Sequence, residues 1–420
     1  MTISFPYQKN FFHNYINFEK TFYFLTLLYA FFVPFLKSTV SLFGVLFIVL
    51  WFLEGNLPDK IIKIKSSKAL TAIVIFVAYM ASTLLWSSDL SHGSRGLAYL
   101  LFWLIIPILS TSLKQEHIPK IITSFLLAMF ISELIAYGMI FDLWTINGRG
   151  SEYPSPFMHH VPYSLFLALT AMILLYRLLS SEYSLQAKAA IFLFFLSVSG
   201  NLFFSIGRTG QLALLLGIIV SFILHYRLTW KSLISSLLLI SLLFFSAYAI
   251  SSNFQKRVHL IGDYAIKFSQ GNLSSSWGLR LTYWIITYEV LLADPLLGAG
   301  LGDLNSDERN AALKKVEDYG FKINNKALTK GHLSNDILMV AFSGGLVGLS
   351  LFCYLIYQLI RLKSRPKELK DLSLIFLFVF GVGTLSEAIT YRQYPMGLFV
   401  LFSALFITAS MQKQKNHSSA

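Results

Sequence analysis

Residues 252–332 read SNFQKRVHLIGDYAIKFSQGNLSSSWGLRLTYWIITYEVLLADPLLGAGLGDLNSDERNAALKKVEDYGFKINNKALTKGH, and this is the only long polar run in a chain that otherwise consists of apolar blocks. The run carries ten Lys or Arg and eight Asp or Glu, together with an aromatic cluster and two Gly-rich turns. The apolar blocks on both sides therefore form a frame that holds this segment, and we expect part of the chemistry within it.

Composition indicates the class of protein. Of the 420 residues, 55% are hydrophobic and 16% aromatic, whereas only 13% are charged. About a quarter of the residues of an average soluble domain are charged. The composition therefore predicts an all-α polytopic membrane protein. A single cysteine, Cys353, excludes both a disulfide framework and a cluster of thiolate metal ligands.

The apolar blocks give the number of membrane spans, because a helix needs about 20 mainly apolar residues to cross a bilayer. Twelve transmembrane helices are predicted, over residues 21–36, 39–55, 69–86, 97–113, 121–141, 161–179, 188–206, 209–226, 232–251, 334–360, 372–390 and 395–411. We predict one integral membrane domain over residues 1–420. The polar run, residues 252–333, is then a large, partly helical loop between the ninth and tenth helices.

The positions of Lys and Arg predict the orientation, since short cytoplasmic loops collect these residues. A cytoplasmic N-terminus places 19 of them inside and only five in the short outer loops. Both termini are then cytoplasmic and the polar loop faces outward, which in a bacterium is the periplasmic side of the inner membrane. Because the net charge of +13 is spread over such loops, it indicates topology and contact with membrane lipids, and nucleic acid is not an expected partner.

The polar loop contains two predicted helices. The first covers residues 277–293 with apolar residues at helical spacing and stops at Asp294-Pro295, because proline cannot continue a helix. It is expected to lie on the membrane surface with Trp277 and Trp284 at the interface. The second is solvated, capped by Ser306 and ended by Gly320. The intervening GAGLGD resembles a phosphate cradle only superficially, because it lacks the following Lys and the strand context.

Three side chains on the outer face are candidates for chemistry. Arg208 lies in the tight turn SIGRTG, Arg280 lies on the first loop helix, and His332 closes the loop. Two guanidinium groups can hold a pyrophosphate, and a histidine can take a proton from an attacking hydroxyl. The structural alternatives are an arginine that snorkels to the interface and a histidine at a helix start. Glu387 is expected to pair with Arg392 or Arg208.

Three sequence blocks occur in order. They are SIGRTGQLALLLG, then WGLRLTYW with DPLLGAGLGDL, then GHLSNDILMVAFSGGLVGL. Together they resemble the O-antigen ligase and polymerase superfamily of bacterial envelope enzymes. The resemblance covers residues 205–350 by motif and the rest of the chain by topology.

One position departs from the family pattern H-x-H-N, which here reads His332-Leu333-Ser334-Asn335. If the first histidine of the pattern is the functional one, His332 takes its role. If the second is, Ser334 is a poor base and another group is needed. We favour His332, and Asn335 is assigned to substrate binding with Arg208 and Arg280.

The resemblance implies a glycosyltransferase without metal or other cofactor. It would ligate a polysaccharide carried on undecaprenyl pyrophosphate to lipid A-core in lipopolysaccharide biosynthesis. Arg208 and Arg280 would hold the diphosphate, and His332 would activate the acceptor hydroxyl. The chain has no DxD motif and no αβ pattern for a nucleotide sugar.

Other functions stay open, among them that of a relative that glycosylates proteins. An O-antigen polymerase uses the same donor with a second lipid-linked glycan as acceptor, so its residues can be nearly the same. A secondary transporter with twelve spans predicts internal repeats and ionisable residues near the midplane. The halves of this chain show no repeat, and its mid-span acids are few, Glu133 and Glu387 being the clearest.

Overall fold

Helices build almost the whole molecule in the computed structural model, which describes residues 17–305, 307–323 and 333–411. They are α1 (Phe18–Phe32), α2 (Ser38–Glu54), α3 (Leu57–Ser66), α4 (Lys68–Ser82), α5 (Leu90–Leu101), α6 (Ile105–Ser112), α7 (Ile118–Ile140), α8 (His160–Leu179), α9 (Leu185–Phe204), α10 (Arg208–Tyr226), α11 (Trp230–Ile250), α12 (Ser252–Ser269), α13 (Ser276–Ala293), α14 (Asp307–Asp318), α15 (Asp336–Ile360), α16 (Lys367–Thr384) and α17 (Gln393–Met411). The predicted all-α class is confirmed.

Nine helical segments of the described chain are long and apolar enough to cross a membrane, and they coincide with nine of the twelve predicted spans. The other three predicted spans are also helices, but less suited to crossing alone. α1 has 15 residues and α2 has 17, while α16 begins with the charged sequence KELKD. By the length and composition of its helices, the described part of the structure therefore has fewer membrane-crossing helices than the twelve spans predicted from the sequence.

The short span α2 ends for a local reason. Gly55 and Asn56 both have positive φ, 70° and 53°, which an uninterrupted helix does not allow. The chain then turns by 116° into α3, which carries the sequence LPDKIIKIKS. The two helices are therefore a bent pair.

α8 lies in the middle of the bundle, where most of its residues are buried. It packs against α9, α10 and α16. Beside it, Phe376 of α16 stacks on Phe399 and Phe402 of α17 with ring centroids 6.1 and 5.5 Å apart. This rigid bundle fixes the ends of α9, α10 and α16.

The loops that the Lys and Arg count assigns to one face lie together at one end of the bundle. Lys114 pairs with Glu19 at 2.7 Å and Arg177 with Glu368 at 3.1 Å. At the opposite end, Tyr394 Oη donates to the carbonyl of Phe157 at 2.9 Å. The contacts agree with the grouping of the loops, whereas the compartment that each end faces stays a prediction.

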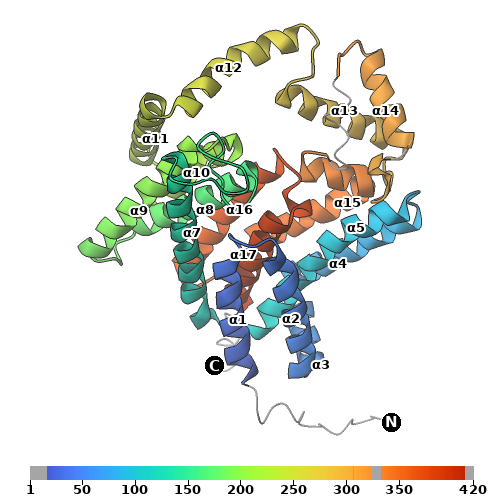
Figure 1. Cartoon of the computed structure of the whole chain (residues 1–420). Helices are drawn as coiled ribbons and strands as arrows, with labels where there is room; N and C mark the ends of the chain where they lie inside the picture. The colour runs from blue at the N-terminus through green and yellow to red at the C-terminus, as the bar shows by residue number, and fades with distance from the viewer. Residues whose placement is uncertain (1–16, 306, 324–332, 412–420) are drawn as a thin grey trace, which may run out of the picture.

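The polar loop folds onto the bundle through a small core of its own. α13 and α14 pack together and against the start of α15 at one end of the molecule (Figure 1). Buried apolar residues join the three helices, among them Tyr283, Ile286, Val290, Val316 and Phe342. The loop is therefore attached to the frame by α15, the helix that follows it.

Both predicted loop helices are present. α13 ends at Ala293, directly before Asp294-Pro295, and the predicted stop is confirmed. α14 ends at Asp318, followed by Gly320 at φ +82°, while Ser306 lies outside the described residues. α14 is less solvated than expected, because Arg309, Ala312 and Val316 are buried.

α12 was not predicted. It follows α11 directly and buries Phe254, with Val258 one turn later packed against the bundle core. That four-residue spacing is the signal in the sequence, but the polar residues between them obscure it.

The GAGLGD segment is a structural turn. Its amides donate to protein acceptors, Ala299 to the carbonyl of Phe342 at 2.8 Å and Gly300 to that of Ser343 at 3.1 Å. Gly302 donates to Ser87 Oγ at 3.0 Å. The segment therefore fastens the loop to α15 and to the connection between α4 and α5, and these amides do not form a phosphate cradle.

Candidate active site

The Arg208 turn is fixed by close packing against α8. A β-carbon at Gly207 would lie 2.2 Å from Ser164 Cβ, and one at Gly210 would lie 2.1 Å from the Ser164 carbonyl oxygen. Only glycine fits at either position. Arg208 therefore starts α10 from a rigid corner, at the helix end whose dipole favours anions.

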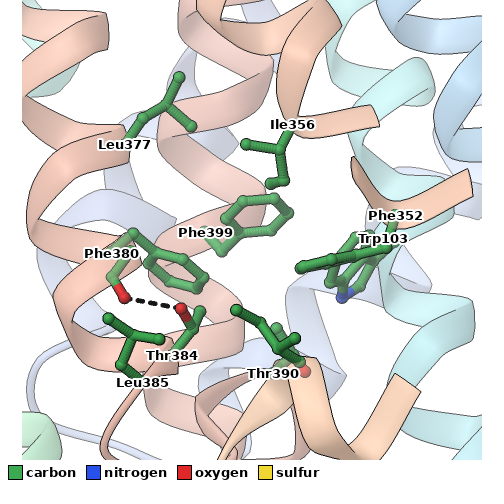
Figure 2. Close-up of a pocket in the computed structure, with 11 residues that line it drawn as sticks. Trp103, Phe352, Ile356, Leu377, Phe380, Thr384, Leu385, Thr390 and Phe399 are labelled. Atoms are coloured by element: carbon green, nitrogen blue, oxygen red, sulfur yellow. Dashed lines mark hydrogen bonds between the residues drawn. The ribbon is translucent and has the colours of Figure 1, made fainter. Parts of the chain in front are cut away.

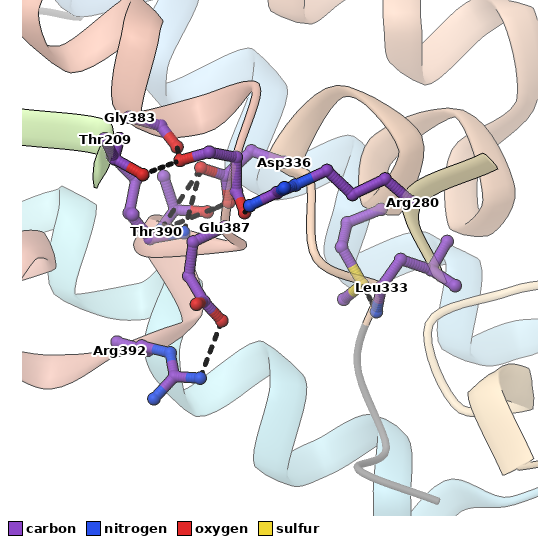
Figure 3. A network of polar contacts seen from close by, with 11 residues as sticks. Thr209, Arg280, Leu333, Asp336, Gly383, Glu387, Thr390 and Arg392 are labelled. Carbon is purple, nitrogen blue, oxygen red and sulfur yellow. Dashed lines mark hydrogen bonds and ion pairs between the residues drawn. The ribbon is translucent and has the colours of Figure 1, made fainter. Parts of the chain in front are cut away.

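Arg280 reaches the same corner from the loop. Its Nη2 donates to the backbone carbonyl of Ser386 at 3.2 Å. The hydroxyl of Ser386 lies 2.7 Å from that of Thr209, the neighbour of Arg208 (Figure 3). Ser386, which follows α16, thus joins α13 of the loop to α10 of the bundle.

The electrostatics of this corner agree with its geometry. Burial lowers the pKa of Arg280, the positive charge of Arg208 lowers it further, and Glu387 opposes both effects. Two positive charges therefore converge here at a cost in repulsion, which an anionic ligand would relieve.

Glu387 forms the predicted ion pair with Arg392. The Arg392 Nη2 atom lies 2.6 Å from Glu387 Oε1. The Glu387 carboxylate thus pairs with Arg392 and also raises the pKa of Arg280. Since Glu387 already has a partner, it offsets the charge of the two arginines only in part.

Asn335 and Asp336 fasten the start of α15 to the segment that carries Ser386. Asn335 Oδ1 accepts from the amides of Ile337 and Leu338 at 2.8 and 3.1 Å, and its Nδ2 donates to the Leu385 carbonyl at 3.3 Å. The predicted substrate-binding residue Asn335 is therefore placed as a helix cap that positions Ser386.

Asp336 is fully buried and holds the turn after Ser386. Its carboxylate accepts from the amide of Ile389 at 3.1 Å, and from the amide and hydroxyl of Thr390 at 3.1 and 2.5 Å (Figure 3). Since these bonds satisfy a buried carboxyl group, Asp336 fixes the backbone that carries the corner.

His332 lies outside the described residues, which resume at Leu333. Ser334, at the position of the second family histidine, hydrogen-bonds the phenol of Tyr283; burial raises the pKa of Tyr283, while Arg309 and this hydrogen bond lower it. The residue that departs from the family pattern therefore faces the core of the loop.

The sequence did not indicate Ser386, Asp336 or Arg309 as parts of this region. Arg309 is 7% exposed and lies near Tyr283. Its place on the buried stripe with Ala312 and Val316 is a signal that the sequence contained. Ser386 has no such signal, because a serine after an apolar helix is common.

A possible metal site lies elsewhere. The one group of three potential ligands found among the described residues is Glu19, Glu116 and His117, whose ligand atoms lie within 4.8 Å of one another. It lies at the other end of the bundle, where Lys114 already pairs with Glu19. The arginine corner offers cationic donors, which suit an anion.

The fold and this corner define an all-α, multi-pass membrane protein with an arginine site where a polar loop meets the bundle. Comparison with known families gives a closer assignment, because residues 191–353 match the O-antigen ligase family. The match confirms the resemblance to the O-antigen ligase and polymerase superfamily over this part of the chain. Comparison with curated proteins finds no match.

Proposed function

We propose that the protein is an O-antigen ligase. It transfers a polysaccharide from undecaprenyl pyrophosphate to a sugar hydroxyl of lipid A-core, at the periplasmic face of the bacterial inner membrane. The observation that carries this proposal is that Ser386 contacts both Arg280 and Thr209, the neighbour of Arg208. These residues belong to a chain of which residues 191–353 match the O-antigen ligase family.

The two arginines have the chemistry that a diphosphate leaving group requires. Each guanidinium offers a planar fork of donors that fits phosphate oxygens and stays charged at neutral pH. As the bond between the anomeric carbon and the diphosphate oxygen breaks, negative charge grows on that oxygen. Donors already fixed in place stabilise this charge without reorganisation.

The new glycosidic bond forms to a hydroxyl oxygen of the acceptor. Its hydroxyl oxygen attacks the anomeric carbon, and the proton passes to the imidazole of His332 as undecaprenyl diphosphate leaves. Inversion at the anomeric carbon is the expected outcome of this direct displacement. Asn335 and Asp336 hold the backbone around Ser386 in place, and Asn335 is in addition assigned to substrate binding with the two arginines.

The composition of envelope glycolipids in a strain that lacks this chain tests the proposal. For a ligase, long polysaccharide accumulates on the lipid carrier and lipid A-core stays bare. Core that carries a single repeat unit would instead indicate a polymerase. An unchanged glycolipid profile would overturn both assignments and favour transport of another compound.

A further inference from the structure

The bundle contains a buried acid that the arginine corner does not use. Glu133 on α7 is fully buried, and neither oxygen of its carboxylate accepts a hydrogen bond of normal geometry from a described residue. It lies within the segment Gln115–Ile140, which is long and apolar enough to cross a membrane. Because an isolated carboxylate is costly in such a place, an ionisable residue there indicates a bound partner.

Glu133 lies on the face of α7 that packs against α9, in the group formed by α7, α8 and α9 (Figure 1). Phe130, one turn earlier on α7, meets Phe194 of α9 edge to face, with ring centroids 5.3 Å apart. Tyr137, one turn later, donates from its hydroxyl to the carbonyl of Ser197 at 2.7 Å. The side chain between these two contacts is that of Glu133, so its carboxylate faces α9.

α9 supplies further oxygen atoms at this place. Asn201 donates from Nδ2 to the Glu133 carbonyl at 3.3 Å, while its buried Oδ1 accepts no hydrogen bond from the described residues. The Ser197 hydroxyl lies close to the Glu133 carboxylate. Tyr163 of α8 lies beside the Asn201 amide, but its hydroxyl donates to the Ser132 carbonyl at 3.4 Å. The cluster therefore offers acceptor oxygens, whereas its phenolic donors are already used.

A surplus of acceptor oxygens around one negative charge suits a small cation. A proton on the carboxyl joins one of its oxygens to the amide and leaves the other without a donor, whereas a cation can be coordinated by all of them. Hard cations take carboxylate, carbonyl and hydroxyl oxygens as ligands. We propose that Glu133, Asn201 and Ser197 bind one Na⁺ ion between α7 and α9.

The charge and the space at the cluster favour Na⁺ over other ions. With one acid only, the cluster lacks the several charged ligands of a divalent metal site, and a monovalent ion leaves no net charge in the low-dielectric interior. The helices are close together, since a β-carbon at Gly200 would lie 2.9 Å from the Tyr137 hydroxyl. The ion is structural and takes no part in glycan transfer.

The cluster differs from the apolar cavity of about 280 Å³ between α15, α16 and α17 (Figure 2). The residues that line this cavity carry no charge. Two of them, Thr384 and Thr390, have hydroxyls, and both donate within the protein. The cavity therefore presents hydrocarbon surface, and a cation is expected at Glu133 instead.

Ion binding at this place stabilises the end of α9, after which the Arg208 turn begins. Gln211 of α10 donates from Nε2 to the carbonyls of Leu202 and Ser205, each at 3.1 Å. The backbone that follows Asn201 is thus fastened to α10. An ion held by Asn201 therefore restrains the residues between the cluster and the arginine turn.

Equilibrium binding of radiolabelled Na⁺ to the purified full chain tests the site without any glycan or lipid-linked donor. With choline chloride holding the ionic strength constant, the wild type should saturate at one ion per chain. Glu133→Gln keeps the shape of the side chain and should weaken binding about tenfold or more, because the charged ligand is lost. Glu152→Gln makes the same change at an exposed position between α7 and α8 and should bind as the wild type does.

A pair of serine variants keeps the test decisive if Glu133→Gln folds poorly. Ser197→Ala removes one neutral ligand and should weaken Na⁺ binding severalfold. Ser199→Ala makes the same small change at a buried position of α9, about 200° around the helix from Ser197. This control should keep wild-type binding. Equal binding in both serine variants would remove Ser197 from the site.

Stability and amide exchange give a second readout. NaCl should raise the melting temperature of the wild type above its value in choline chloride, and should slow amide exchange of residues 201–208. Both effects should be absent from Glu133→Gln. Wild-type protein without saturable Na⁺ binding, or Glu133→Gln with full binding, would overturn the inference. A melting temperature that depends on pH but not on Na⁺ would assign the carboxyl to a proton and would overturn it as well.

Discussion

Arg208 and Arg280 lie on elements that are far apart in the sequence, yet both are fixed by neighbours rather than by each other. Gly207 and Gly210 hold the first, and the Ser386 carbonyl holds the second. Their mutual repulsion helps to lower the pKa of Arg280. The two arginines therefore form a cationic site that suits an anionic ligand.

Lysine substitutions test whether the arginines act through their forked geometry. Arg208→Lys and Arg280→Lys keep the charge and lose the second donor. Loss of one charge-assisted hydrogen bond predicts transfer reduced roughly 10- to 100-fold in each variant. Rates of polysaccharide transfer by the purified protein provide the measurement.

Arg95→Lys is the matched control, because Arg95 is exposed on α5 and should keep its rate. Full activity in Arg208→Lys would indicate that this arginine is a charge anchor at the membrane surface.

Asp336→Ala should destabilise the protein by roughly 2–4 kcal/mol, because the buried donors of Ile389 and Thr390 lose their acceptor. Thermal unfolding of the detergent-solubilised protein gives the measurement. Thr390→Val removes only one of these donors and should cost less. An unchanged melting temperature in Asp336→Ala would show that the turn after Ser386 is held by other contacts.

Residue type alone could not predict how Asn335 acts. An asparagine before an apolar helix is both a good cap and a good sugar ligand, and the structure uses its carboxamide as a cap. The pairing of Glu387 with Arg392 was predictable, since the two are close in sequence. The contact of Arg280 with Ser386 was not, because it joins residues 106 positions apart.

Among the elements, α13 and α14 depend on an acid at their interface. Glu289 accepts from Lys315 Nζ at 2.5 Å and from Tyr319 Oη at 2.6 Å. These hydrogen bonds hold the pKa of Glu289 below its ordinary value. The stabilisation is therefore present above the ordinary glutamate pKa and is lost as pH falls through the lower value of the folded state.

Acidification should therefore loosen α14 from α13. Amide exchange of residues 307–318, compared between wild type and Glu289→Gln at each pH, measures this effect. The difference between the two proteins should be present at neutral pH and vanish in acid. A difference that persists after Glu289 is protonated would mean that the glutamine acts by altered packing instead.

α15 contains a break that its glycine explains. Gly345 has φ +60°, and a β-carbon there would lie 2.3 Å from the Leu296 carbonyl oxygen. Gly345→Ala should therefore destabilise by roughly 1–3 kcal/mol or more. Gly262→Ala on α12, where an added β-carbon would meet no described atom, should be neutral or slightly stabilising. Equal melting temperatures would contradict the close packing of loop and helix.

The elements were predictable where local chemistry sets a boundary. Asp294-Pro295 ended α13 as expected, and Gly320 followed α14. The bend between α2 and α3 was not predicted: Gly55 and Asn56, residue types that readily adopt positive φ, mark the end of α2, but they do not specify the direction in which the chain continues. α12 was missed because its buried side holds few apolar residues.

For the whole molecule, composition was enough to predict an all-α membrane protein. An apolar segment long enough to cross a bilayer has to satisfy its backbone hydrogen bonds internally, which a helix does. The grouping of loops followed from where Lys and Arg occur. The attachment of the polar loop to the bundle could not be predicted from the sequence. It depends on GAGLGD amides that bind the broken part of α15, a fit between backbones that no pattern of side chains reveals.

The central claim is that the loop and the bundle form one site, with Arg280 and Arg208 acting on the same diphosphate. A double-mutant cycle tests it most directly. Transfer rates are measured for the reconstituted wild type, Arg208→Lys, Arg280→Lys and the double variant. Residues that act as a unit give non-additive effects, so the double variant should be little slower than the slower single variant. Fully multiplicative losses, or wild-type rates in both single variants, would contradict a shared site.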